Sequence, residues 1–131
     1  MTDKKLSIDD LYTDAGTFDE QEVLRTLQDR VVFTKDNDIL FTTDPDKLQA
    51  RDVILLYALA KQMLRSADKV DSQIITNAEV QHKTKLKKTT VGVTIMRLKE
   101  KKLLLGADGG YEIPPFKIPE VIKLLNSDTS K

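Results

Sequence analysis

Positively charged side chains are concentrated between His82 and Lys102, where eight Lys or Arg residues accompany a single acid, Glu100. This segment has a formal charge of +7, although the whole chain, with 21 basic and 21 acidic residues, has a net charge of zero. Clustered ammonium and guanidinium groups keep a strong local field that attracts a polyanion. The pattern therefore indicates binding to phosphates, with nucleic acid as the first candidate.

The residue types give little indication of metal binding or catalysis. The chain has no cysteine, and its one histidine, His82, has only Glu79 at helical ligand spacing, which is too few ligands for zinc. The carboxylate pairs, such as Asp9 with Asp10 and Asp36 with Asp38, fall in expected turns or arms without a neighbouring base. There is no nucleophile elbow and no phosphate-binding glycine loop. We expect no catalytic residues, no metal and no cofactor, and thus not an enzyme.

Length and hydropathy predict one soluble domain. A chain of 131 residues can bury a single core, and its longest apolar block, Val53 to Ala60, is too short to span a membrane. No signal peptide is visible at the N-terminus, so we expect an intracellular, cytoplasmic protein without a membrane partner. Residues 1–50 carry a net charge of −6 and residues 51–131 a net charge of +6. The two halves are therefore electrostatically complementary.

The first 46 residues predict an appendage to the main domain. Residues 1–17 form an acidic arm that is loosely held, and residues 18–46 form a helix followed by a β-hairpin. Thr17 with Glu20 has the spacing of a capping box, which predicts a helix of about ten residues with Val23, Leu24 and Leu27 inward. In the hairpin, Phe33 is expected to face Phe41 across the two strands.

Residues 47–125 predict the main domain, and residues 126–131 a polar tail. A long helix is expected from Asp44-Pro45 onward, with its apolar block covered on several sides. Thr76 with Glu79 predicts a second helix to about Lys85. A third helix, capped by Thr89 or Thr90 and covering about residues 89–102, would bury the aliphatic residues Val91, Ile95 and Leu98. A hairpin with the turn Asp108-Gly109-Gly110 and an amphipathic helix from Ile118 to Leu125 complete the expected elements.

The order helix, short strand, helix, turn, helix and glycine-tipped hairpin resembles the winged helix-turn-helix superfamily of DNA-binding domains. The residues that carry this resemblance are ITNAEVQHKTKLKKTTVGVTIMRLKEKKLLLGADGGYEI. Together with the preceding long helix the resemblance extends from Lys47 to Ile113, about half of the chain, and it depends on the order and spacing of the elements, without a family signature. It implies an α+β fold, a winged helix-turn-helix domain with an N-terminal helix and β-hairpin extension, in which residues 89–102 enter the major groove of duplex DNA. The wing tip has Asp108 and no basic residue, which argues against its insertion into a minor groove.

The resemblance and the charge pattern together predict the DNA-binding residues. Arg97 would read guanine, Val93 or Met96 would contact a thymine methyl, and Gly92 would allow close backbone approach. Ammonium groups near the helix start would contact phosphates. The predicted set is Lys83, Lys85, Lys87, Lys88, Thr89, Thr90, Val93, Arg97 and Lys101. Aromatic residues make up only 5% of the chain, which favours duplex DNA over a single strand, and the function expected is that of a transcriptional regulator.

Two alternatives remain open at this level. The same scaffold can serve as a protein-interaction adaptor that does not bind DNA, and exposed Val93 and Met96 would suit such a contact. In that case the basic helix would bind either an acidic surface of another protein or residues 1–50 of this chain. The apolar side of Ile118 to Leu125 could form a homodimer interface or close the core of the monomer.

Overall fold

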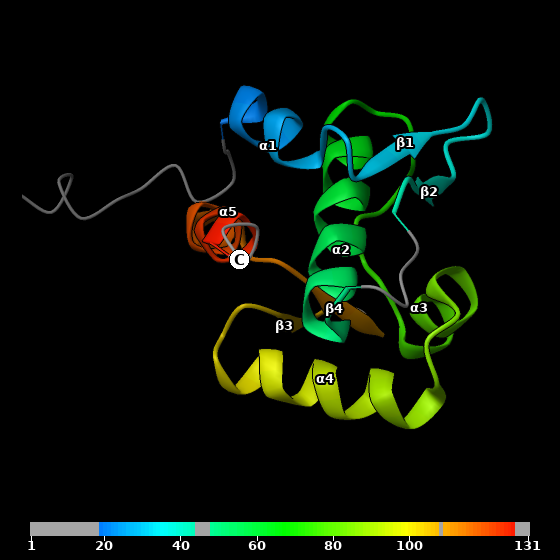
Figure 1. Cartoon of the computed structure of the whole chain (residues 1–131), viewed down its shortest axis with the longest axis vertical. Coiled ribbons are helices and arrows are strands. Elements are labelled where there is room, and N and C mark those ends of the chain that lie inside the picture. The colour runs from blue at the N-terminus through cyan, green and yellow to red at the C-terminus, as the bar shows by residue number, and fades with distance from the viewer. Residues whose placement is uncertain (1–18, 44–47, 108, 128–131) are drawn as a thin grey trace, which may run out of the picture.

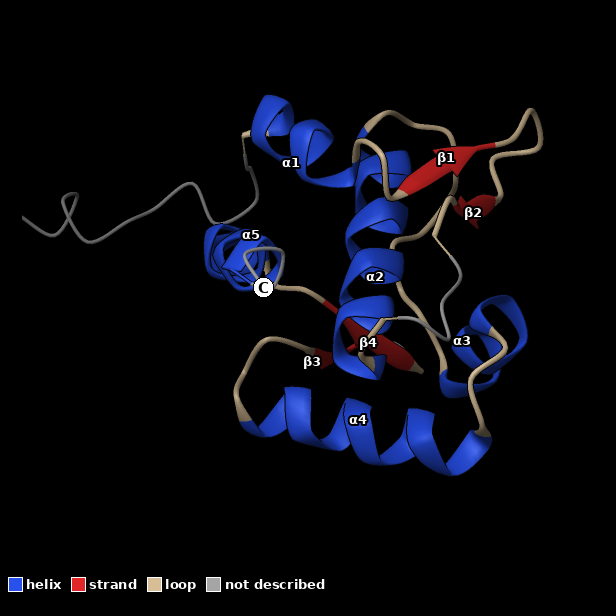
Figure 2. Cartoon of the chain, viewed as in Figure 1, coloured by secondary structure: helices blue, strands red, loops and turns tan. Residues whose placement is uncertain are grey.

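The computed structural model describes residues 19–43, 48–107 and 109–127. This part of the chain is a mixed α+β structure of five α-helices and two antiparallel hairpins, as Figure 2 shows. None of its helices combines the length and the apolar character needed to cross a membrane.

Helix α2 (Ala50–Ser66) forms the centre of the molecule, with the other helices and the first hairpin arranged around it (Figure 1). The prediction of an all-round apolar core helix is confirmed, because every residue from Val53 to Ala60 is at most 3% exposed. The predicted start was wrong. Asp44 and Pro45 lie outside the described residues, and the helix begins at Ala50 after Gln49, whose backbone is extended. Asp-Pro is also common in turns, so this pair alone does not determine where the helix begins.

Helix α1 (Glu20–Leu27) begins after Asp19, whose carboxylate accepts hydrogen bonds from the backbone N–H groups of Gln21 and Glu22 at 3.0 and 3.2 Å. Asp19 is therefore the N-cap, whereas the predicted cap, Thr17, lies outside the described residues. Val23 and Leu27 are buried as expected. Leu24 is 40% exposed, so its prediction as a core residue was wrong, because it lies one helical step away from the buried side.

Strands β1 (Val31–Phe33) and β2 (Ile39–Phe41) form the predicted hairpin. Its register pairs Phe33 with Ile39 and Val31 with Phe41, so the two phenylalanines do not face each other and that prediction was wrong. The five residues of the connection set this register, and Val31 and Ile39 point to the core as a result. The hairpin is linked to the end of α2 by a hydrogen bond from Asn37 Nδ2 to the carbonyl of Lys69 at 3.0 Å.

Helix α3 (Asn77–Thr84) is capped by Thr76, whose Oγ1 accepts from the backbone N–H of Glu79 at 3.0 Å. Only this half of the predicted capping box is present. The Glu79 carboxylate accepts instead from the Tyr57 hydroxyl at 2.5 Å and the Lys61 ammonium at 2.6 Å, both on α2. These two bonds fix α3 against the central helix. The helix ends at Thr84, and its C-cap residue Lys85 has a left-handed backbone with φ of 67°.

Helix α4 (Lys88–Glu100) packs against both α2 and α3 and forms the lower edge of the molecule in Figure 1. Lys87 is its N-cap residue and makes no capping bond with its side chain. Thr89 and Thr90 therefore lie inside the first turn, and their prediction as caps was wrong. The helix also ends two residues earlier than predicted, because Lys102 adopts a positive φ of 63°.

The second hairpin, β3 (Leu105–Ala107) with β4 (Gly110–Glu112), follows α4. Leu103 and Leu104 precede the strand as buried core residues. Ile75 and Tyr111 form a bridge through two backbone hydrogen bonds of 2.9 and 2.8 Å, so the chain before α3 pairs with β4. A Cβ on Gly110 would lie 2.3 Å from the Ile75 carbonyl oxygen, and this close approach requires glycine.

After the 3₁₀ turn η3 (Pro115–Lys117), helix α5 (Ile118–Ser127) packs on α1 and α2. Its residues Ile118, Val121, Ile122 and Leu125 are each at most 4% exposed. Of the two roles considered for this apolar side, the structure shows that it closes the core of the chain itself.

Candidate nucleic-acid interface

The candidate interface is centred on α4, which has one buried side and one open side. Val91, Ile95 and Leu98 are each 1% exposed, as their spacing of four and three residues predicted. These three residues hold the helix against α2 and α3. The polar and charged residues between them are left at the surface, where they can meet a partner.

Three predicted cations lie together around the start of α4. Lys85 is the C-cap of α3, Lys87 is the N-cap of α4 and Lys88 is its first residue, and all three are exposed. The first turn of α4 contains no acidic residue. The ammonium groups therefore add to the positive end of the helix dipole, and no acidic side chain in this turn offsets them. Such an arrangement favours contact with a phosphate.

Lys83 is directed to a different part of the surface. Its Nζ atom lies 3.0 Å from Asp38 Oδ1 in the connection of the first hairpin, and both side chains are substantially exposed. An exposed ion pair of this kind contributes about 0–1 kcal/mol, so it sets the position of Lys83 without holding it strongly. The structure thus separates Lys83 from the cations at the start of α4.

The open side of α4 is apolar and uncrowded. Val93 is 49% exposed and Met96 is 63% exposed, and both line a groove of about 380 Å³ together with Thr89, Gly92 and Tyr111. A Cβ on Gly92 would meet nothing within 4 Å. Neighbouring atoms therefore do not require glycine at this helical position, where glycine costs about 0.5–1 kcal/mol relative to alanine. The helix backbone at Gly92 is accessible to a ligand.

One side of this groove is formed by the second hairpin. The Lys99 ammonium lies 5.4 Å from the centre of the Tyr111 ring, which is cation–π geometry. Lys99 was not among the predicted site residues. The described residues of the hairpin tip, Ala107, Gly109 and Gly110, carry no charge, and Asp108 lies outside the described part.

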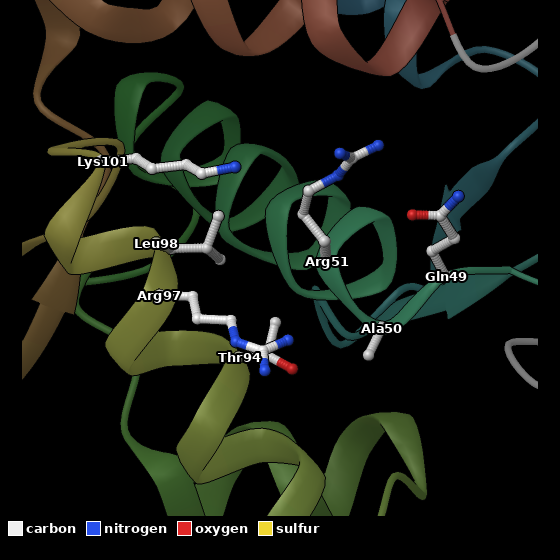
Figure 3. A pocket seen from close by; sticks show the side chains of 7 residues that line it. All are labelled: Gln49, Ala50, Arg51, Thr94, Arg97, Leu98 and Lys101. Carbon is white, nitrogen blue, oxygen red and sulfur yellow. The ribbon is translucent and has the colours of Figure 1, made fainter.

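Arg97 and Lys101 lie on the other side of α4, where they border a pocket of about 320 Å³ between α4 and the first turn of α2 (Figure 3). Arg51, which sequence reasoning missed, contributes a third cation from α2. Thr90 is half-buried beside this edge of the helix and is less accessible than Thr89. The pocket is lined by Gln49, Ala50, Arg51, Thr94, Arg97, Leu98 and Lys101.

The predicted set is therefore divided among four places. Lys85, Lys87, Lys88 and Thr89 gather at the start of α4, Val93 lies on its open side, and Arg97 and Lys101 lie beside α2. Only Lys83 points to the first hairpin. In the described residues no group of three or more His, Asp or Glu side chains is placed to hold a metal ion.

Comparison with known proteins gives no assignment, because no family model, curated protein or solved structure matches the chain.

Proposed function

We propose that this protein binds duplex DNA as a winged helix-turn-helix domain and acts as a cytoplasmic transcriptional regulator, with α4 as its recognition helix. The order of α2, α3, α4 and the β3–β4 hairpin supports this architecture. The bridge between Ile75 and Tyr111 pairs the segment before α3 with β4, at the position where the expected order has a short strand. In this proposal the β3–β4 hairpin is the wing, and α1 with the first hairpin is the extension.

The observation that carries the proposal is the group of exposed lysines at the start of α4, beside an accessible helix backbone. Lys85, Lys87 and Lys88 would bind phosphates on one side of the major groove. Thr89 and Val93 would then face base edges, and Gly92 would allow the helix to approach closely. Contacts to phosphate supply affinity, whereas the contacts along the open side would supply any sequence preference.

A titration of a fluorescent duplex by anisotropy at several salt concentrations tests this proposal. Each phosphate neutralised contributes about −0.9 to the slope of log affinity against log salt, so four to six contacts predict a slope of roughly −3.6 to −5.4. A duplex that binds no more tightly than millimolar at low salt would refute DNA binding. An affinity that is independent of salt would refute the role given to the lysines.

A protein-interaction adaptor is the second candidate, and the exposure of Val93 and Met96 favours it. Apolar side chains in a groove beside Tyr111 suit burial against another protein. Removal of residues 1–17 helps to separate the two candidates. A large gain in duplex affinity would indicate that the acidic segment masks α4, as in a regulated DNA-binding protein. If neither form binds duplex, while Met96→Gln abolishes association with a partner, the adaptor is the better account.

If the DNA site is palindromic, its two-fold symmetry would favour binding by a homodimer of this protein. Such a dimer would need a surface other than Ile118, Val121, Ile122 and Leu125, because these side chains are buried within one chain.

A further inference from the structure

The pocket between α2 and α4 is lined by several positively charged side chains. Of the seven described residues that line it, three are cationic, namely Arg51, Arg97 and Lys101, and none is acidic. In Figure 3 the side chain of Arg97 extends from α4, that of Lys101 from the C-cap position of α4, and that of Arg51 from the facing turn of α2. Arg97 and Lys101 are four residues apart at the end of this helix, a spacing at which like charges repel each other.

The charges around this pocket are only partly compensated. Arg51 Nε lies 3.1 Å from Asp52 Oδ1, so Asp52 offsets one of the three positive charges. For Arg97 and Lys101, the described part of the chain provides no ion-pair partner. The start of α2 adds a partial positive charge, since the Gln49 side chain does not cap it. An anion in the pocket would relieve the repulsion among these groups.

We propose that this pocket binds a phosphate group. The guanidinium group of Arg97 offers paired N–H donors that match phosphate oxygens, and Lys101 adds a compact charge. Arg51, which is paired with Asp52, adds its positive charge to the wall of the pocket. The Thr94 hydroxyl is a further hydrogen-bonding group in the lining. A volume of about 320 Å³ is at the lower end for small-molecule sites, so the pocket has room for the group to which the phosphate is attached.

The phosphate can come from two sources. One is a phosphorylated small molecule, which would make the pocket an effector site and does not depend on DNA binding. The other is the backbone of duplex DNA, and this source rests on the proposed function. In both cases Arg97 binds an anion next to α2. This role differs from the contact with guanine that the sequence predicted for Arg97.

Amide NMR shifts of the full chain, titrated separately with inorganic phosphate and with a short duplex, test the proposal. Sodium chloride at matched ionic strength is the control for screening. We expect saturable shifts at Ala50, Thr94 and Lys101, and a dissociation constant at least tenfold higher in Lys101→Gln. Arg51→Gln should act in the same direction, although its ion pair with Asp52 makes Lys101→Gln the cleaner variant. Lys35→Gln, which removes an exposed cation in the connection of the first hairpin, should leave the constant unchanged.

The outcomes separate the two sources. Saturable binding of inorganic phosphate supports the effector site even if no duplex binds. Shifts at these amides with duplex alone, weakened by Lys101→Gln, support a backbone phosphate. The proposal is overturned if chloride reproduces the shifts, if neither probe moves these amides, or if folded Lys101→Gln keeps the full affinity.

Discussion

Replacement of Gly92 by alanine should stabilise the fold and weaken binding of duplex DNA. A helical glycine is less stable than alanine by about 0.5–1 kcal/mol, chiefly because glycine loses more backbone entropy on folding. An added Cβ at Gly92 would meet nothing within 4 Å, so no clash reduces this gain. For a domain of this size the midpoint of thermal unfolding should rise by about 2–5 °C.

The same methyl group would stand on the open side of α4. If duplex DNA approaches the helix backbone at Gly92, the methyl group displaces it, and we expect a loss of about tenfold in affinity, which corresponds to about 1.4 kcal/mol. Thermal unfolding and duplex anisotropy on the same preparation measure both effects. Opposite changes in stability and affinity distinguish a functional glycine from one that merely tolerates exchange.

The control is Gln21→Ala, because Gln21 is an exposed residue of α1, which lies on the opposite side of the molecule from α4 (Figure 1). It should leave duplex affinity unchanged. A loss of stability in Gly92→Ala would contradict the open space around Gly92. A gain in stability without any loss of affinity would refute close approach of DNA at this position.

Three further changes test the site and the core. Lys87→Gln combined with Lys88→Gln should make the slope of log duplex affinity against log salt less steep by about 1.8, measured by anisotropy, and an unchanged slope would remove these lysines from the interface. Ile95→Ala should lower the free energy of unfolding by about 2–5 kcal/mol in urea, since Ile95 is 1% exposed, and a loss below 1 kcal/mol would contradict its place in the core. Burial, followed by the hydrogen bond to Glu79, raises the pKa of Tyr57 above its usual value of 10.0, so the unfolded chain loses this proton first. Stability should therefore fall as the pH rises above 10, by up to about 1.4 kcal/mol per pH unit, and Tyr57→Phe should remove this component of the fall.

Local patterns in the sequence predicted the parts of the fold that depend on nearby residues. The spacing of Val91, Ile95 and Leu98 identified the buried side of α4, because residues three and four apart share one side of a helix. The apolar block of α2 likewise identified the core helix. Capping residues were less well predicted, since Asp19 and Thr17 are both good caps and only one position can start the helix.

Contacts between distant segments were not predictable in this way. The register that separates Phe33 from Phe41 depends on the turn between the strands. Glu79 bonds to Tyr57 and Lys61 because α3 packs on α2, a contact that no local spacing encodes. For the same reason the convergence of Arg51 with Arg97 became visible only in the folded chain.

The most direct test of the central claim is the reactivity of each lysine toward an amine-modifying reagent, measured by mass spectrometry with and without duplex DNA. We predict strong protection of Lys85, Lys87 and Lys88 by the duplex, with no protection of Lys35 and Lys69, which are exposed elsewhere. Equal protection of all these lysines, or protection that omits the start of α4, would contradict α4 as the helix that binds DNA.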